Sequence, residues 1–112
     1  MHVDGGLPFS KLSQLPYLRA CIKEGVRHSH AVSARNPRVF NKELKYKGWT
    51  VPPRRPVSMT IADVQFYEDL YQDAIRFAPE RWLGDAKSAN GESLEQYFVG
   101  FGKGQRVCLR IK

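Results

Sequence analysis

The stretch FGKGQRVC, residues 101–108, ends in one of the two cysteines of the 112-residue chain. Gly102 and Gly104 allow the backbone to turn tightly and to approach a flat ligand closely. A thiolate at the end of such a loop is a strong, soft ligand for iron, tuned by the surrounding backbone N–H groups. Arg106, two residues before Cys108, is able to pair with a carboxylate. The stretch therefore has the features of an iron-ligating loop.

Other kinds of glycine or cysteine site do not fit this segment. The G-x-G-x-G run at 100–104 lacks the strand, turn and helix that surround a dinucleotide-binding fingerprint. Gly104 follows Lys103 where a phosphate-binding loop needs Ser or Thr. A zinc site needs paired cysteines, and no C-x-x-C lies near His28 and His30. These two histidines are interpreted as solvent-facing residues at the end of a helix.

That helix is predicted over residues 14–28. Its apolar residues, Leu15, Leu18, Ile22 and Val26, recur at steps of three and four, which is typical of an amphipathic helix. Pro16 suits a first turn. Glu24 and Arg27 are three residues apart, so they share a face of the helix and can touch. Taken alone, such a pair is most often an ordinary surface ion pair worth a few tenths of a kcal/mol.

Shorter patterns follow the helix. Turn residues at Asn36-Pro37, Lys47-Gly48 and Pro52-Pro53 separate short apolar runs, and predict a small antiparallel hairpin plus an extra strand. Residues 61–66 are long enough for one helical turn or two. Beyond Phe77 the sequence is irregular, apart from the motif Pro79-Glu80-Arg81-Trp82. There Pro79 forces an extended approach, which would hold Arg81 and Trp82 in a fixed loop. Residues 1–13 show no sustained period and are interpreted as a lead-in without a regular element.

Together, these three motifs resemble the C-terminal signature of the cytochrome P450 superfamily of haem-thiolate monooxygenases, and most closely its fungal members. In that family an E-x-x-R on the K helix precedes a P-E-R-F/W loop and then F-x-x-G-x-R-x-C. The resemblance covers about residues 15–112. It implies a mainly α fold with a small β part (α+β). The whole chain, 1–112, is then one partial domain: a lead-in (1–13), the K helix (14–28), a β region (29–60), the PERW loop and meander (61–97), and the haem-binding loop (98–112).

The resemblance also implies roles for individual residues. Cys108 would be the axial ligand of the haem iron, and Arg106 would pair with a haem propionate. Phe101 would shield the thiolate from water, and Gly102 and Gly104 would belong to the same haem-binding loop. Arg35 and Arg38 could also reach a propionate. A buried structural triad would be formed by Glu24, Arg27 and Arg81.

The function implied is binding of haem (iron protoporphyrin IX) and oxygen-dependent hydroxylation of a small lipophilic substrate. Electrons would come from NADPH through a cytochrome P450 reductase. The alternative is a non-catalytic, truncated remnant of a monooxygenase. The formal charge of +7 and the pI near 9.7 suit an acidic reductase surface. A basic nucleic-acid-binding module predicts the same charge but not the order of the motifs, so no nucleic acid is expected as a partner.

The sequence also departs from the family pattern. Arg110 stands where the family usually has Gly two residues after the cysteine, and Gln72 where related sequences have Pro. The family's oxygen-activating helix, substrate-recognition segments and N-terminal anchor are absent, and the sequence stops four residues after Cys108. We therefore expect that the chain does not catalyse oxygenation by itself. No stretch approaches the roughly 18 apolar residues of a membrane span, and a location at the endoplasmic-reticulum membrane is expected for a full-length relative.

Overall fold

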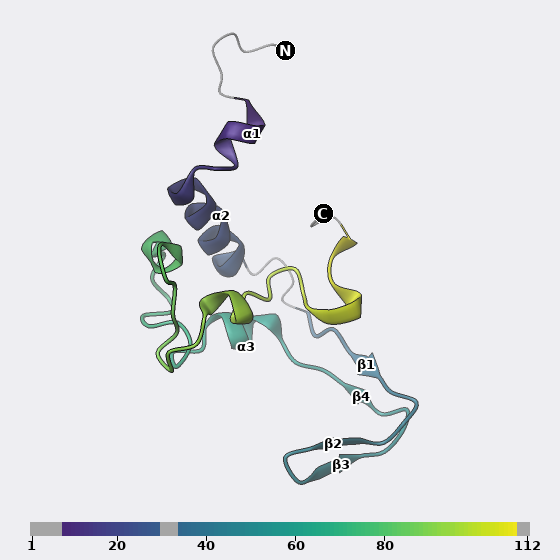
Figure 1. Cartoon of the computed structure of the whole chain (residues 1–112). Coiled ribbons are helices and arrows are strands. Elements are labelled where there is room, and N and C mark those ends of the chain that lie inside the picture. Colours follow the sequence, from purple (N-terminus) through teal and green to yellow (C-terminus); the bar gives the residue numbers. More distant parts are fainter. Residues whose placement is uncertain (1–7, 30–33, 110–112) are drawn as a thin grey trace.

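Helix α2, Pro16–His28, carries the first of the motifs (Figure 1). The structure is a computed structural model and describes residues 8–29 and 34–109. Pro16 takes a position in the first turn, where its missing N–H is not needed. Arg27 and His28 lie in the last turn, where positive charge is favoured by the helix dipole. The helix begins two residues later than the sequence pattern predicts, after Leu15, which is still extended.

A short helix, α1, spans Phe9–Leu12 and precedes α2. The N–H groups of Lys11 and Leu12 donate to the carbonyl of Pro8, and the Ser13 hydroxyl donates to the carbonyl of Ser10. The prediction of no regular element before α2 is wrong for these residues. A single helical turn is too short to show the apolar period by which a helix is found in a sequence.

The β region consists of two antiparallel pairs rather than a hairpin plus one strand. The hairpin is formed by β2 and β3, and its ends are joined by a second pair, β1 with β4. The strands are β1 (Arg38–Val39), β2 (Leu44–Tyr46), β3 (Trp49–Val51) and β4 (Pro56–Val57). Lys47 and Gly48 make the hairpin turn with φ of 43° and 83°, the positive values that a tight two-residue hairpin turn requires.

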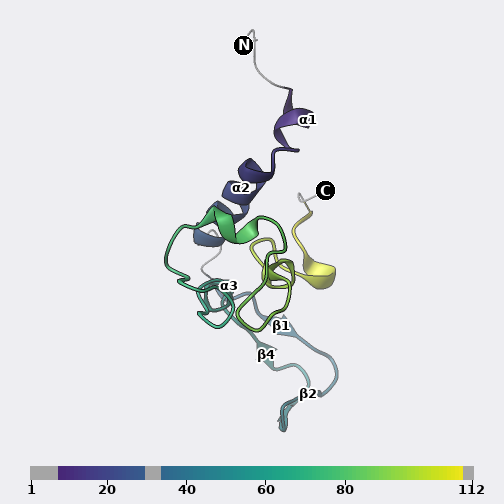
Figure 2. The ribbon, with the colours of Figure 1, turned by 60° about the vertical axis from the view of Figure 1, so that its left-hand side comes forward.

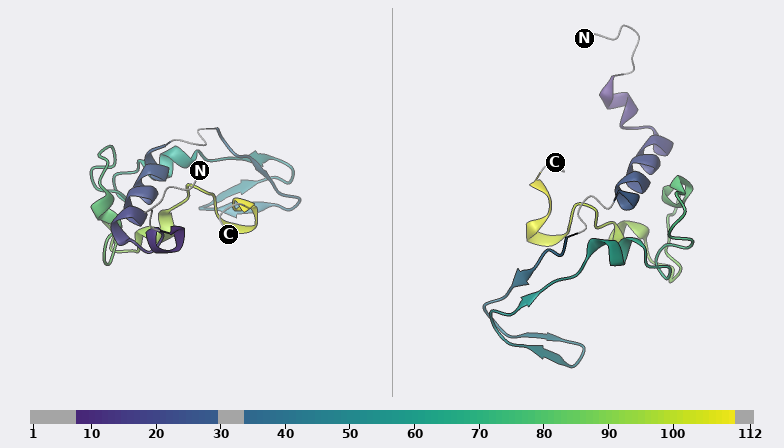
Figure 3. Two further views of the ribbon diagram at one scale, coloured as in Figure 1. Left: turned by 90° about the horizontal axis from the view of Figure 1, so that it is seen from above. Right: turned by 180° about the vertical axis from the view of Figure 1, so that it is seen from behind.

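This β region projects as an arm away from α2 (Figures 1 and 2), and the view from behind shows the same arrangement (Figure 3). The described chain is accordingly elongated, with extents of 59 × 34 × 20 Å. The remaining elements are short and are separated by irregular loops: α3 (Ile61–Gln65) and three 3-10 helices, η1 (Pro79–Trp82), η2 (Leu94–Tyr97) and η3 (Gly104–Arg106). A few helices with short antiparallel pairs confirm the predicted α+β class.

The core lies where η1 packs against α2. Its buried apolar residues come from α2, the loop before η1, η1 itself and η2: Ala20, Tyr71, Ala74, Trp82 and Leu94. The charged side chains of Glu24 and Arg27 are buried beside them, with 0% exposure. Burying charge is costly unless it is paired and hydrogen-bonded, so this part of the fold depends on polar contacts. Within the described ranges, no helix is both long and apolar enough to cross a membrane.

Candidate functional site

A buried ion pair on α2 forms the centre of a polar network. The guanidinium of Arg27 meets the Glu24 carboxylate through two hydrogen bonds, Nε to Oε2 at 3.0 Å and Nη2 to Oε1 at 2.8 Å. Two parallel bonds of this kind are the strongest form of an Arg–carboxylate contact. The helix supplies this geometry because residues three apart lie on the same face. The pair is therefore a buried structural contact and not the surface pair that the motif alone would suggest.

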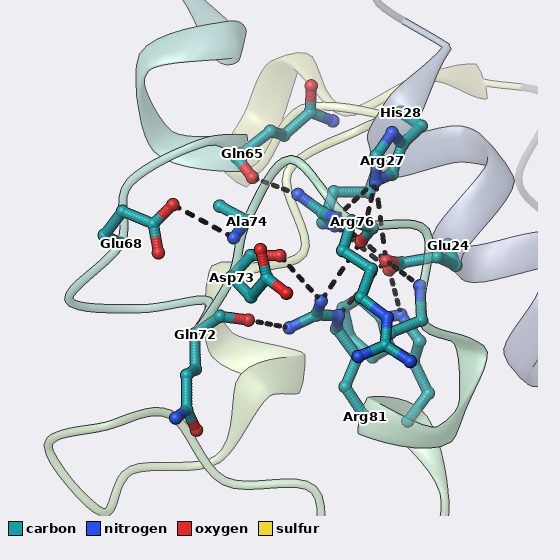
Figure 4. A network of polar contacts seen from close by, with 12 residues as sticks. Glu24, Arg27, His28, Gln65, Glu68, Gln72, Asp73, Ala74, Arg76 and Arg81 are labelled. Atoms are coloured by element: carbon teal, nitrogen blue, oxygen red, sulfur yellow. Dashed lines mark hydrogen bonds and ion pairs between the residues drawn. The ribbon is translucent and has the colours of Figure 1, made fainter.

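Arg81 reaches this pair from η1 (Figure 4). Its Nε donates to Glu24 Oε1 at 3.1 Å. The other guanidinium nitrogens donate to backbone carbonyls of the loop before η1, at 2.9 Å to Gln72 and 3.3 Å to each of Asp73 and Arg76. The structure thus brings together Glu24, Arg27 and Arg81, the three residues expected to form a triad.

Trp82 and Ala78 complete the shell around the carboxylate. The indole Nε1 of Trp82 donates to Glu24 Oε2 at 2.8 Å, and the Ala78 N–H donates to Oε1 at 3.0 Å. Burial acts to raise the pKa of Glu24, but the hydrogen bonds from Arg27, Ala78 and Trp82, with the charge of Arg27, outweigh it and lower the pKa to about 2. No sequence pattern indicates this partner of Trp82. The available signal was its type, because a buried indole N–H usually finds an acceptor.

His28 extends the network at the end of α2. The ring nitrogen Nε2 lies 2.6 Å from Arg27 Nη2 and 3.2 Å from the Arg76 carbonyl. Because the guanidinium only donates, Nε2 is the acceptor in the shorter contact, and the Arg76 carbonyl, which is also an acceptor, is then a neighbour of Nε2 and not its hydrogen-bond partner. The ring also makes edge contacts with Phe66 and Phe77, at centroid distances of 5.5 and 5.6 Å. The prediction that His28 faces solvent is therefore wrong. His30 lies outside the described residues.

The Cys108 loop begins at Phe101 and is closed by a backbone hydrogen bond. The N–H of Cys108 donates to the carbonyl of Phe101 at 2.9 Å. Gly102 and Gly104 have φ of 75° and 76°, a left-handed conformation that favours glycine. The Cys108 side chain is exposed, and the ring of Phe101 lies 6.1 Å from that of Phe98. Arg106 is the last residue of η3.

The residues of this loop fit a haem. Among the residues that the structure describes, no group of three or more His, Cys, Asp or Glu side chains is placed to hold a metal ion. Cys108 offers one exposed thiol, flanked by Val107 and Leu109, which are 37% and 90% exposed. One thiolate beside exposed apolar side chains suits an iron whose other ligands come mainly from a flat macrocycle.

Two of the arginines predicted to reach a haem propionate lie outside the Cys108 loop. Arg35 and Arg38 are exposed, and Arg38 bends back to the carbonyls of Asn36 and Pro37 at 3.4 and 3.3 Å. Their reach to a propionate stays a prediction. Arg110 lies outside the described residues.

Comparison with known proteins identifies the family. The family model described as Cytochrome P450 matches residues 3–109. The chain is 54% identical, over 102 residues, to "Cytochrome P450 monooxygenase sdnE" of Sordaria araneosa, covering 89% of this chain and 20% of that protein. It is 38% identical, over 108 residues, to the "Fusicoccadiene C-8 hydroxylase" of Alternaria brassicicola, with coverages of 95% and 20%.

A solved structure, "Retinoic acid bound cyanobacterial CYP120A1", superimposes with a TM-score of 0.79 at 31% identity. The match covers 92% of this chain and 23% of that one. The chain spans about a fifth of the length of the curated relatives described above. The family-model match over 3–109 and the shared fold agree with the three motifs, and the chain belongs to the cytochrome P450 family.

Proposed function

We propose that this chain forms the thiolate side of a haem-binding monooxygenase, with Cys108 as the axial ligand of the iron. The observation that carries the proposal is the Cys108 loop. Its thiol is exposed at the end of a turn that two left-handed glycines shape and one backbone hydrogen bond closes. Such a loop can present one sulfur to a flat ligand without a side chain in the way.

Within the family, haem when bound supplies the activation of dioxygen for hydroxylation, and the protein supplies binding and orientation. Cys108 would hold the iron through its thiolate. Phe101 lies at the base of the loop, where its carbonyl accepts the Cys108 N–H at 2.9 Å, and its ring would limit the access of water to the sulfur. Arg106 would neutralise a propionate. In this proposal each of these side chains binds or orients the cofactor, and none transfers a proton.

The network of Glu24, Arg27 and Arg81 has a structural role in this proposal. Arg27 and Arg81 donate to the carbonyls of Gln65, Gln72, Asp73 and Arg76, at 2.6 to 3.4 Å. The loop before η1 has little regular structure of its own to satisfy these carbonyls. The network therefore holds the meander against α2. In this proposal it also supports the part of the fold from which the Cys108 loop extends.

For the complete protein we propose a small lipophilic substrate and electrons from NADPH through a cytochrome P450 reductase. Relatives named as monooxygenases, and one named as a hydroxylase of fusicoccadiene, support this substrate class. The formal charge of +7 supports an acidic docking partner. A position at the endoplasmic-reticulum membrane is proposed with them, because a lipophilic substrate partitions into the bilayer.

The test is the spectrum of the reduced, carbon-monoxide-bound form of a full-length protein carrying this chain. We expect the Soret band at the position typical of thiolate ligation. Cys108→Ala should abolish that band position, whereas Cys21→Ala should keep it, because Cys21 lies half-buried on α2 away from the loop motif. A spectrum that depends on Cys21 and not on Cys108 would overturn the assignment.

A further inference from the structure

Gly100 lies directly against α2. A Cβ atom built on it would be 2.4 Å from Cγ1 of Val26 and 3.5 Å from Nε2 of Gln65. Real Cβ atoms essentially never come within 3.0 Å of another heavy atom, and ordinary contact begins at 3.4 Å. The requirement for glycine here is one of space. Any larger residue would have to displace either the chain at position 100 or the Val26 side chain, and a β-branched side chain on a helix has little rotamer freedom.

The surface under Gly100 belongs to the charged network. Val26 stands between Glu24 and Arg27 in the sequence of α2. Gln65, the second neighbour, accepts a hydrogen bond from Arg27 Nη1 on its backbone carbonyl at 2.6 Å. The segment that leads into the Cys108 loop therefore rests on the residues that the network holds in place.

Phe98 makes a second contact between the same two regions. Its ring lies edge-on to that of Trp82, at a centroid distance of 5.5 Å, and to that of Phe101, at 6.1 Å. Both distances are within the range of favourable aromatic pairs. Trp82 is anchored to Glu24 through its indole N–H, and the carbonyl of Phe101 receives the N–H of Cys108. Aromatic contacts thus run from the carboxylate to the base of the cysteine loop.

We propose that residues 98–101, which we name the docking segment, set the position of Cys108 relative to α2, and that Gly100 is the positioning residue at its closest approach. The inference rests on the proposed haem-thiolate function. Gly100 does not touch the cofactor in this proposal. It acts through Val26 on one side and through the adjoining Phe101 on the other, so a side chain added at position 100 would push the sulfur away from its place unless Val26 is made smaller.

The size of the displacement follows from the contact distances. Moving a Cβ from 2.4 Å to an ordinary contact of 3.4 Å requires a shift of about 1 Å. Functional groups must be held within roughly 0.5 Å of their productive positions. A shift of about 1 Å at position 100, eight residues before Cys108, therefore exceeds what a metal ligand tolerates if the loop moves as a unit.

The experiment compares four variants of a full-length protein carrying this chain. Gly100→Ala introduces the clash, and Val26→Ala removes the atom that it meets. The double variant restores the space, and Gly25→Ala is the matched control, because nothing lies within 4 Å of its added Cβ. The readouts are the fraction of bound haem with the thiolate-type Soret band in the reduced, carbon-monoxide-bound spectrum, and the thermal midpoint of unfolding.

We expect Gly100→Ala to lose most of the thiolate-type band, the double variant to regain it, and the Val26→Ala and Gly25→Ala single variants to keep it. An unchanged band in Gly100→Ala overturns the inference, and so does a double variant that stays defective. If Gly100→Ala yields no folded protein, the double variant decides in the same way. A starting protein without the thiolate-type band refutes the proposed function itself, which separates the two failures.

Discussion

Replacing Glu24 with Gln would test whether one ionised carboxylate holds the network together. Five hydrogen bonds converge on it: Oε2 accepts from Arg27 Nε and Trp82 Nε1, and Oε1 accepts from Arg27 Nη2, Ala78 N and Arg81 Nε. A Gln side chain has one oxygen and one NH₂ group, which only donates. Whichever way the amide is turned, at least two of the five donors face another donor. Both guanidinium groups also lose their shared counter-charge.

The expected loss in the free energy of unfolding of Glu24→Gln can be worked out in two ways. Each buried donor left without an acceptor costs about 1–3 kcal/mol, and breaking a buried ion pair costs about 3–5 kcal/mol. Separately, the pKa of Glu24 is lowered from 4.5 to about 2, and each unit is worth roughly 1.4 kcal/mol, which gives about 3 kcal/mol. The two routes agree. We expect Glu24→Gln to lower the free energy of unfolding by about 3–5 kcal/mol at neutral pH.

The pH dependence provides a second signature. Because the folded-state pKa of Glu24 lies below its ordinary value of 4.5, its contribution to stability is fully present above that value. It is lost as the pH falls towards about 2, where the folded protein also binds the proton. The Gln variant has no such group at this position. The difference in stability between the two proteins should therefore narrow as the solution is acidified.

Urea unfolding of a full-length protein carrying this chain, measured from neutral to acidic pH, checks both expectations. Glu43→Gln is the matched control, because Glu43 is half-exposed and meets Lys45 at 3.5 Å on the surface of the hairpin. Such a pair contributes about 0–1 kcal/mol. If Glu24→Gln costs no more than this control, or if its cost does not change with pH, the carboxylate is not the centre of the network.

Two further substitutions test neighbours of the network by the same urea measurement. Trp82→Phe keeps a ring in the core but removes the indole donor to Glu24, so we expect a loss of about 1.5–3 kcal/mol, and an unchanged midpoint would show that the bond contributes nothing. In Tyr71, burial raises the pKa to about 12, and the hydroxyl has no hydrogen-bond partner in the described part of the chain. Tyr71→Phe should leave stability equal or raise it by up to about 1–3 kcal/mol, and a clear loss would contradict this reading of the hydroxyl.

Local sequence patterns predicted the elements whose conformation is decided locally. The apolar period and Pro16 marked α2, and Lys47-Gly48 marked the hairpin turn, because dihedral preferences belong to the residues themselves. The confirmed family assignment came from the order of three motifs. The four residues of α1 are too few for a period, and α1 was not predicted. Of the second strand pair only one extra strand was predicted, and its pairing was not.

Burial, and contacts between segments far apart in the sequence, could not be predicted from local sequence patterns. From spacing alone, Glu24 and Arg27 were most simply a surface pair, and only the motifs on later segments suggested that they were buried. The partner of Trp82 and the partial burial of His28 depend on chain segments more than forty residues away in sequence. Gly100 looked like part of a glycine-rich loop, whereas its nearest neighbour is a helix residue, which no local pattern indicates.

The sequence separations within the charged network bear on the order in which this region folds. Arg27 bonds to carbonyls 38 and 49 residues away, and Glu24 to an arginine 57 residues away. Closing such loops costs chain entropy before any contact compensates for it. Helix α2 can form from local contacts, whereas the carbonyls of the meander depend on the arginine side chains for their hydrogen bonds. We therefore expect the irregular segment to become ordered after α2, and to be open to proteases until it packs against that helix.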